Sequence, residues 1–246
     1  MRVLIGAWRL TRALLHLLHG MAVITLRFGW LDAAGRHARI QWWSGKLLRC
    51  MGIGLAVNGA PRPGATLLVA NHISWLDVAA IHAAAPQARF VSKSDVKHWP
   101  LIGRLVAGAG TLFIERESKR DALRVVHRVA DALRAGDMVA VFPEGTTGAG
   151  RKLLPFHANL LQAAIATEVP AQPVALRFFQ PGQTFSEAVD FTGPTTLMQS
   201  VWRIACAQGL RVEVTLLDAG GTAHADRRAL AAHLREQIEL VLARAG

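Results

Sequence analysis

Short apolar runs alternate with longer segments of helical periodicity through most of this 246-residue chain. Apolar runs of roughly four to eight residues are typical of buried strands, and the longer segments between them are typical of helices. Alternating strands and helices predict an α/β fold, with a mostly parallel sheet flanked by helices. The expected strands are 66–70, 88–92, 111–115, 138–142, 172–178 and 211–217, and the expected helices are 75–85, 95–108, 118–135, 153–167, 199–207 and 224–244.

Positive charge is concentrated at the N-terminus. The formal net charge is +11, and residues 1–50 carry +7 of it, with Asp32 as their single acid and with four of the seven tryptophans. Tryptophan and basic residues together are typical of a membrane interface, where the indole lies at the apolar boundary and cations meet lipid phosphates. A nucleic-acid-binding protein would instead need basic residues across the main domain, so no nucleic-acid partner is expected.

The first 30 residues divide into two faces when they are placed on a helix at about 100° per residue. The apolar run between Arg12 and Arg27 is only 14 residues long, whereas a membrane-spanning helix needs about 20. We therefore expect a helix that lies in or dips into one leaflet, followed by a second helix near 33–50. The alternative is a helical pair packed on its own domain with arginines facing solvent. One arc holds Arg2, Arg9, Arg12, His16, His19 and Arg27, and the opposite arc holds Leu4, Leu10, Leu14, Leu15, Leu18, Ala22 and Thr25.

A turn-rich stretch at 58–64 joins these helices to the rest of the chain. We expect residues 1–50 to form the membrane-docking part and residues 51–246 the main domain. Cys50 and Cys206 form neither a zinc-type spacing nor a disulfide framework, which fits a reducing compartment. The histidines likewise show no zinc-type spacing, so no metal is expected.

The apolar run that ends at Ala70 is followed by Asn71-His72-Ile73-Ser74-Trp75-Leu76-Asp77. A histidine that follows a strand lies at the edge of the sheet, and Asp77 falls in the first turn of the next helix. Such a carboxylate can hold the imidazole in one tautomer and leave its other nitrogen free to accept a proton. A structural histidine beside a helix-capping aspartate would give the same short pattern.

Three further blocks follow strands, and ligands bind beyond the carboxyl ends of strands in such sheets. Arg116 directly follows the expected strand 111–115. The expected strand 138–142 is followed by the turn Pro143-Glu144-Gly145-Thr146-Thr147. Backbone N–H groups and hydroxyls in such a turn can hold an anion or a polar group. The segment 169–174 is a proline-marked entry to a further strand. Four such signals in one order make an accidental His72/Asp77 pair much less plausible.

The order of these four blocks resembles that of the glycerolipid acyltransferases, in particular the 1-acyl-sn-glycerol-3-phosphate (lysophosphatidate) acyltransferases, over about residues 65–180. The resemblance implies transfer of an acyl group from acyl-CoA or acyl carrier protein to a lysophospholipid hydroxyl, with no further cofactor. It also implies an anionic membrane surface as a partner and a peripheral or monotopic location on the cytoplasmic face of the inner membrane.

The resemblance assigns roles to particular residues. It implies that His72 is the general base and Asp77 the carboxylate that orients it, that Arg116 binds phosphate, and that Glu144 and Gly145 engage the acceptor. Thr146 belongs to the same turn as Glu144. Lys93 ends the run 90–92 and faces the acceptor phosphate in one interpretation, or solvent in another. Backbone amides near Asn71 or in the turn at 144–146 are candidates for oxyanion donors.

The residues suit this chemistry without the resemblance. An alcohol attacks a thioester poorly until a base removes its proton, and general-base assistance is worth roughly 10²–10⁴-fold in rate. The acceptor hydroxyl takes the place of a serine nucleophile, so no acyl-enzyme is needed, and the chain has no Gly-x-Ser-x-Gly motif.

Two positions depart from the pattern of the family. Thr147 and His157 stand where lysophosphatidate-specific members commonly carry arginine and lysine. Fewer cations weaken the case for a phosphomonoester acceptor. O-acylation of a lyso-ornithine lipid is therefore a second hypothesis, and a non-catalytic membrane-binding module is a third.

Overall fold

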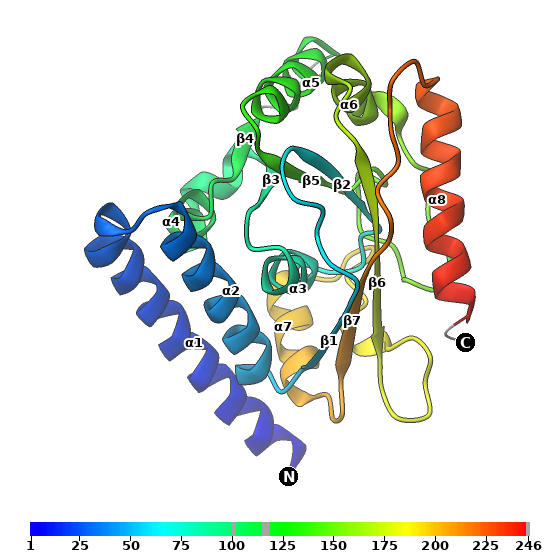
Figure 1. The fold of residues 1–246 in the computed structure, drawn as a ribbon. Helices are drawn as coiled ribbons and strands as arrows, with labels where there is room; N and C mark the ends of the chain where they lie inside the picture. Colours follow the sequence, from blue (N-terminus) through cyan, green and yellow to red (C-terminus); the bar gives the residue numbers. More distant parts are fainter. Residues whose placement is uncertain (100–101, 115–118, 245–246) are drawn as a thin grey trace.

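Two long helices open the chain and form an antiparallel pair. The computed structural model describes residues 1–99, 102–114 and 119–244. Helix α1 (Arg2–Arg27) runs into a short 3-10 helix (Phe28–Trp30), and α2 (Ala33–Cys50) returns beside it. Figure 1 shows the pair lying along one side of the molecule rather than projecting from it. The two helices expected over residues 1–50 are thus confirmed.

A seven-stranded mixed sheet forms the centre of the fold. Its strand order is β1-β7-β6-β2-β5-β3-β4, and every neighbouring pair is parallel except β6 and β7. This confirms the predicted α/β fold with a mostly parallel sheet. The strands are β1 (Gly54–Asn58), β2 (Thr66–Ala70), β3 (Ala88–Lys93), β4 (Leu112–Ile114), β5 (Met138–Val141), β6 (Ala171–Phe179) and β7 (Arg211–Leu216).

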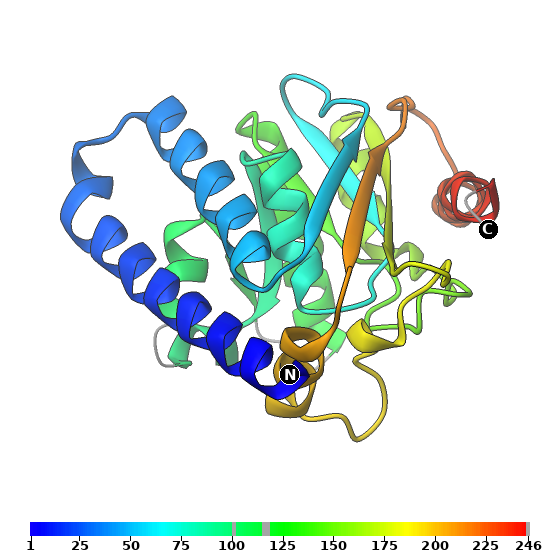
Figure 2. The ribbon, with the colours of Figure 1, turned by 90° about the horizontal axis from the view of Figure 1, so that it is seen from below.

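Helices cover both faces of the sheet, so its central strands are buried on both sides. In β2, Leu68 packs on the face covered by α2 and α3, whereas Leu67 packs on the opposite face against α5, α6 and α8. Figure 2 shows the sheet between these two layers. The remaining helices are α3 (Leu76–Ala84), α4 (Ile102–Gly108), α5 (Lys119–Arg134), α6 (Leu161–Thr167), α7 (Leu197–Cys206) and α8 (Arg227–Arg244).

The sequence prediction missed one strand and misplaced two helices. Strand β1 was not predicted because its apolar run Leu55-Ala56-Val57 is only three residues long and directly precedes the turn-rich stretch at 58–64. All five of its residues are exposed at the edge of the sheet. The expected helix 153–167 begins only with a 3-10 turn at Ala158 and continues as α6. The expected helix 95–108 is described as a 3-10 helix (Ser94–His98) followed by α4. Pro100 lies between these two and lacks the backbone donor that a continuous helix requires.

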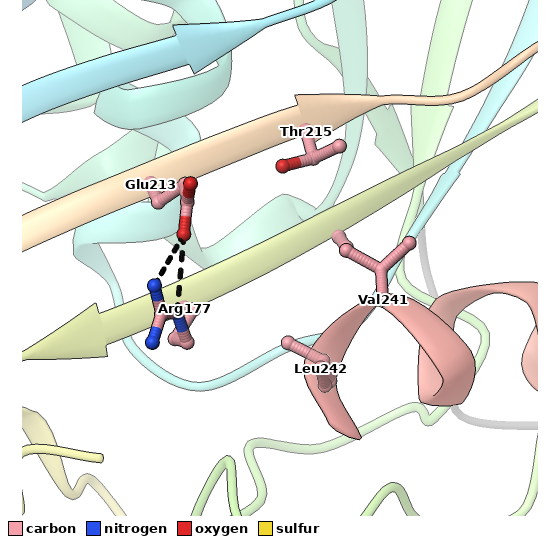
Figure 3. A pocket seen from close by; sticks show the side chains of 6 residues that line it. Arg177, Glu213, Thr215, Val241 and Leu242 are labelled. Carbon is pink, nitrogen blue, oxygen red and sulfur yellow. Dashed lines mark hydrogen bonds and ion pairs between the residues drawn. The ribbon is translucent and has the colours of Figure 1, made fainter. Parts of the chain in front are cut away.

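Helix α8 packs against the antiparallel part of the sheet. Between them lies a cavity of only about 10 Å³, bordered by Val241 and Leu242 of α8. Arg177 of β6 and Glu213 of β7 form an ion pair there, with the guanidinium and carboxylate 2.6 Å apart (Figure 3). The cavity holds about one water molecule at most. This cavity between α8 and the sheet is therefore too small for a substrate.

The face of α1 that packs on the protein is its small and polar face. Gly6, Ala13, His16 and Gly20 are buried, whereas Leu4, Leu14, Leu15 and Leu18 of the leucine arc are exposed. Leu10 of that arc packs in part against the core. His16 Nε2 donates to the carbonyl of Trp43 at 2.9 Å, and Trp43 Nε1 donates to the carbonyl of His16 at 3.1 Å. Burial lowers the pKa of His16, so its ring is neutral against α2. A helix of a water-soluble protein normally buries its apolar face, so this arrangement is reversed.

Arg9 shows how part of the basic arc packs on the protein, although Arg2, His19 and Arg27 of that arc are exposed. Its guanidinium donates to the carbonyl of Ala205 at 3.0 Å and also to the carbonyl of Ala207. These are carbonyl groups at the C-terminal end of α7, where a helix leaves its acceptors unpaired and favours a cation. Arg9 therefore joins α1 to α7 and does not face solvent.

Core contacts join residues 1–50 to the remainder. Leu47, Leu48 and Cys50 of α2 belong to the same buried cluster as Leu68 of β2 and Leu76 of α3. The division into a docking part at 1–50 and a main domain at 51–246 stays a prediction about function, since the two parts share one core.

Candidate active site

The loop after β2 carries the candidate catalytic residues to the carboxyl edge of the sheet. Asn71, the first residue of this loop, is fully buried and bridges to the neighbouring strand β6. Its amide nitrogen donates to the carbonyl of Leu176 at 3.0 Å, and its amide oxygen accepts from the N–H of Leu176 at 2.7 Å. The Asn71 side chain thus replaces a strand residue in pairing with β6. It fixes the starting point of the loop.

His72 and Asp77 are in direct contact. His72 Nδ1 lies 2.7 Å from Asp77 Oδ2, and the same oxygen accepts the backbone N–H groups of Ile73 at 2.6 Å and Ser74 at 2.9 Å. The Asp77 side chain is fully buried, whereas that of His72 is 21% exposed. The five-residue spacing works because the chain turns tightly before α3 and brings Asp77 back over the loop.

The hydrogen bonds assign the tautomer of His72. A carboxylate oxygen that already takes two backbone N–H donors is an acceptor, so the proton of the neutral ring lies on Nδ1. Nε2 is then unprotonated and is the ring nitrogen that can accept a proton. This is the arrangement predicted from the sequence.

Phe142 stacks on the imidazole of His72. The two ring centroids are 4.1 Å apart and the ring planes differ by 14°. Phe90 of β3 lies behind Phe142 at 5.7 Å between centroids. The ring of His72 is thus held at its edge by Asp77 and on one face by Phe142. The sequence predicts Phe142 only as the last residue of the strand 138–142; its position directly after β5, next to β2 in the sheet, was the available signal.

Glu144 supports the same loop from the other side. Its carboxylate accepts the backbone N–H of His72 at 2.7 Å and that of Leu154 at 2.9 Å. The backbone N–H of Gly148 in turn donates to the carbonyl of His72 at 2.8 Å. Burial raises the pKa of Glu144, and the two backbone donors work against this shift. Glu144, which the sequence predicts to engage the acceptor, is only 4% exposed. Both of its carboxylate oxygens already accept backbone N–H groups.

Gly145 and Thr146 are the exposed residues of this turn. Gly145 has φ of +71°, a backbone conformation that favours glycine, and the exposed His157 ring lies beside it. The hydroxyl of Thr147 donates to the carbonyl of Phe191. Of the two departures noted in the sequence, His157 thus borders the exposed turn, while the Thr147 hydroxyl is engaged with the segment before α7.

Two predicted cationic residues cannot be placed with the others. Lys93 is the last residue of β3 and pairs in register with Ile114 of β4. The structure describes the backbone of Lys93 only. Arg116 lies outside the described residues. Both stay predictions.

The catalytic loop is also tied to α7. Trp75 Nε1 donates to Ser200 Oγ at 3.2 Å, and Ser200 is fully buried. The bond adds a specific connection between the His72 loop and a helix 125 residues further along the chain.

A separate hollow of about 320 Å³ lies where the strands begin. Arg36, His37, Arg89 and Asp137 line it together with the start of β5. Arg89 is paired with Asp137 across it. Because His72 follows the carboxyl end of β2, this hollow lies at the opposite edge of the sheet and is not part of the His72 site. Within the described ranges, no group of three or more His, Cys, Asp or Glu residues could hold a metal ion.

Comparison with known proteins matches this fold and site to one family. Residues 56–177 match the model of the family described as Acyltransferase. The chain is 34% identical over 207 residues to a lyso-ornithine lipid O-acyltransferase from Pseudomonas aeruginosa, with 84% of this chain and 79% of the relative covered. It is 37% identical over 202 residues to a 1-acyl-sn-glycerol-3-phosphate acyltransferase from Neisseria gonorrhoeae, with 80% of this chain and 77% of that relative covered.

A solved structure has the same fold. The crystal structure of the 1-acyl-sn-glycerophosphate (LPA) acyltransferase PlsC from Thermotoga maritima superimposes with a TM-score of 0.76. The alignment covers 99% of this chain and 97% of that one at 17% identity. Fold and family match together define an acyltransferase. The chain belongs to the acyltransferase family of lipid biosynthesis, among the lysophospholipid acyltransferases, which confirms the resemblance seen in the sequence.

Proposed function

We propose that the chain transfers a fatty acyl group from an acyl thioester to the sn-2 hydroxyl of 1-acyl-sn-glycerol-3-phosphate, giving phosphatidate, with His72 as general base. The observation that carries this proposal is the 2.7 Å contact between His72 Nδ1 and the buried Asp77, which leaves Nε2 of a partly exposed ring free. The acyl donor is acyl-CoA or acyl carrier protein. Both donors present the same thioester to the site.

The proposed reaction has two stages, attack by the acceptor hydroxyl and expulsion of the thiolate. His72 Nε2 takes the proton of the acceptor hydroxyl as the hydroxyl oxygen bonds to the thioester carbonyl carbon. The tetrahedral intermediate then expels the thiolate as the C–S bond breaks, and the imidazolium returns its proton to the sulfur. The products are the new ester and a free thiol.

Asp77 supports both stages of this reaction. Its carboxylate holds the Nδ1 proton and so directs Nε2 toward the substrate. When the ring becomes an imidazolium, the carboxylate stabilises the positive charge. Its full burial strengthens this interaction, because charges attract more strongly where water is excluded.

Direct attack by the acceptor fits the surroundings of His72. Ser74 is the nearest serine in sequence, but it is fully buried and its hydroxyl accepts from the N–H of Leu76 at 3.4 Å. It therefore does not present a nucleophile to an acyl donor. The hydroxyl that His72 activates belongs to the acceptor.

A lyso-ornithine lipid is the second candidate acceptor, and Thr147 favours it. The Thr147 side chain carries no charge and its hydroxyl is bonded to the carbonyl of Phe191, so it supplies no cation for a phosphomonoester. The relative from Pseudomonas aeruginosa bears the corresponding name. The His157 ring lies beside Gly145 and could provide a positive charge at this turn when it is protonated.

A competition between acceptors separates the two candidates. Purified protein would receive lysophosphatidate and lyso-ornithine lipid, each with acyl-CoA or with acyl carrier protein, while released thiol is measured. We expect the higher kcat/KM with lysophosphatidate, and we expect Thr147→Arg to raise this preference about tenfold by adding a charge-assisted contact. Turnover of lyso-ornithine lipid alone would overturn the first candidate in favour of the second. Turnover of neither would contradict both.

We further propose that α1 lies in one leaflet, on the cytoplasmic face of the inner membrane. By length and composition alone, the segment Arg2–Trp30 is long and apolar enough to cross a membrane. However, α1 packs against α2, α4 and α7 along its length, so its inner face is covered by protein. Its outward leucines, with Trp30 91% exposed just beyond them, suit an in-plane position.

Substitution tests this membrane docking better than deletion of residues 1–50, because α2 contributes Leu47 and Leu48 to the core. The variant Leu4→Gln/Trp8→Gln removes two exposed apolar side chains from α1. We expect it to sediment with anionic phosphatidylglycerol vesicles at least tenfold less than the unaltered chain. Unchanged sedimentation would refute docking through α1.

A further inference from the structure

Helix α7 exposes two large apolar side chains outside the N-terminal pair. Met198 is 75% exposed and Trp202 is 40% exposed. They are four residues apart and so lie on neighbouring turns of one helix face. Ser200 and Ile204 on the inner face of α7 are fully buried. The exposed pair is therefore not needed to hold α7 on the domain.

The C-terminal end of this face of α7 contacts α1. Cys206, one further turn along from Trp202, lies so close to α1 that a Cβ added at Gly6 would come within 2.6 Å of its Sγ. Arg9 adds hydrogen bonds to the last carbonyl groups of α7. Figure 2 shows α7 against the N-terminal end of α1. Met198 and Trp202 thus continue the apolar surface that α1 begins with Leu4 and Trp8.

Charge indicates what covers this combined surface. Residues 1–31 and 191–212, which include α1 and α7, contain no Asp or Glu. Arg2 on α1 and Arg203 on α7 are exposed beside the apolar side chains. The acids nearest to α7 in sequence, Asp190 and Glu213, lie just outside this range. Exposed tryptophan and methionine beside arginine match an anionic phospholipid bilayer, with apolar chains below and phosphates above.

The same helix contacts the active-site loops. Ser200 of α7 accepts the indole N–H of Trp75 in the His72 loop, and Phe191 before α7 accepts the hydroxyl of Thr147 in the Glu144 turn. A bilayer on the outer face of α7 is therefore linked to the His72 loop through the inner face of α7 and to the Glu144 turn through the segment that precedes α7. This position would let a lysophospholipid move from the leaflet to His72 without crossing water.

We propose that α7 is a third membrane-contacting helix, in which Met198 and Trp202 enter an anionic phospholipid leaflet beside α1 and bring the His72 site to its surface. The inference rests on the proposed docking through α1 and extends it by a separate element. It assigns the bilayer, not a second copy of the chain, to this face.

Vesicle binding of matched variants tests α7 separately from α1. The full chain would be compared with Met198→Gln, with Met198→Gln/Trp202→Gln and with Leu4→Gln/Trp8→Gln, using phosphatidylglycerol vesicles. Leu240→Gln on α8 is the matched control, because Leu240 is an exposed leucine on the far side of the sheet. We expect the double α7 variant to bind about tenfold more weakly, Met198→Gln to bind a few-fold more weakly, and Leu240→Gln to bind like the unaltered chain.

A second measurement keeps the test valid if the double variant unfolds. Brominated lipids quench the fluorescence of tryptophans that lie in the bilayer. The part of the fluorescence that these lipids remove should therefore become smaller when Trp202 is replaced by Phe. Loss of binding in the α1 variant alone, with no quenching of Trp202, would overturn the α7 proposal and leave docking through α1 intact. Unchanged binding in both variants would overturn both. A lipid-free dimer that Met198→Gln breaks would show that a second copy covers this face, and would also overturn the proposal.

Discussion

Glu144 Oε1 accepts the backbone N–H of His72 at 2.7 Å, so a carboxylate 72 residues further along the chain fixes the backbone of the candidate base. The other oxygen of the same carboxylate accepts the N–H of Leu154. The His72 loop and the segment 144–154 therefore form one unit at the ends of β2 and β5. We propose that Glu144 acts in this unit by positioning the His72 loop.

Replacing Glu144 by glutamine should lower kcat with little effect on the acceptor's KM. The amide can accept only one of the two backbone N–H groups, so the His72 loop loses part of its support. Leaving a buried donor unpaired costs about 1–3 kcal/mol, and the free energy of unfolding should fall by that amount. Steady-state kinetics and urea unfolding provide both measurements.

Glu236→Gln on α8 is the control for the loss of a carboxylate, because Glu236 is exposed. Both its kinetics and its stability should match those of the unaltered chain. A Glu144→Gln variant with a raised acceptor KM and an unchanged kcat would instead support the substrate contact predicted from the sequence.

Phe142→Leu should reduce kcat about tenfold by releasing one face of the imidazole, since a small misplacement of a catalytic group is costly. Phe142→Tyr keeps an aromatic face against the ring and should retain most of the activity. The KM for the acceptor should change little in either variant. Equal activity of the leucine and tyrosine variants would show that the 4.1 Å stack does not position His72.

Gly20→Ala should destabilise the contact between α1 and α2. An added Cβ would lie 2.3 Å from Trp43 Nε1, which donates to the carbonyl of His16. Overpacking of this kind costs about 1–3 kcal/mol, and Trp43 should become more exposed to solvent. Gly29→Ala is the control, because nothing lies within 4 Å of its added Cβ. Identical melting temperatures for the two variants would contradict the described packing of α1.

Stability should fall in mild acid because of His82. Burial lowers the pKa of His82 to about 4, while the unfolded chain has the ordinary value of 6.5. Between these values the unfolded state binds the extra proton, so stability is lost as pH falls below about 6.5. The loss from pH 7 to pH 5 is about 2 kcal/mol. Urea unfolding at both pH values should show at least this difference, and His82→Gln should remove the share due to His82, leaving the loss that the lowered pKa of His16 adds. His233→Gln, at an exposed position of α8, should keep it.

Sequence patterns located the strands and the His72/Asp77 pair because these depend on local order. Apolar runs mark buried strands wherever they occur, and the five-residue spacing places Asp77 back over His72 through one tight turn. Strand β1 offers only the three-residue apolar run Leu55-Ala56-Val57 beside a turn-rich stretch, and its residues are exposed at the sheet edge.

Contacts between distant residues could not be predicted in this way. The pattern of α1 gives two opposite arcs but does not say which one meets the protein. That depends on Arg9 reaching carbonyl groups 196 and 198 residues away and on glycines that allow close approach. Likewise, the sequence shows a carboxylate at Glu144 but not the two backbone N–H groups that occupy it.

The central claim is that His72 Nε2 removes the proton of the acceptor hydroxyl, with Asp77 holding the opposite side of the ring. The most direct test measures thiol release by His72→Gln with saturating acyl donor and acceptor, after circular dichroism has established that the variant is folded. We predict that kcat falls by about 10²–10⁴-fold or more, because general-base assistance is lost. A folded His72→Gln variant that retains acyl transfer within a few-fold of the unaltered chain would contradict this account.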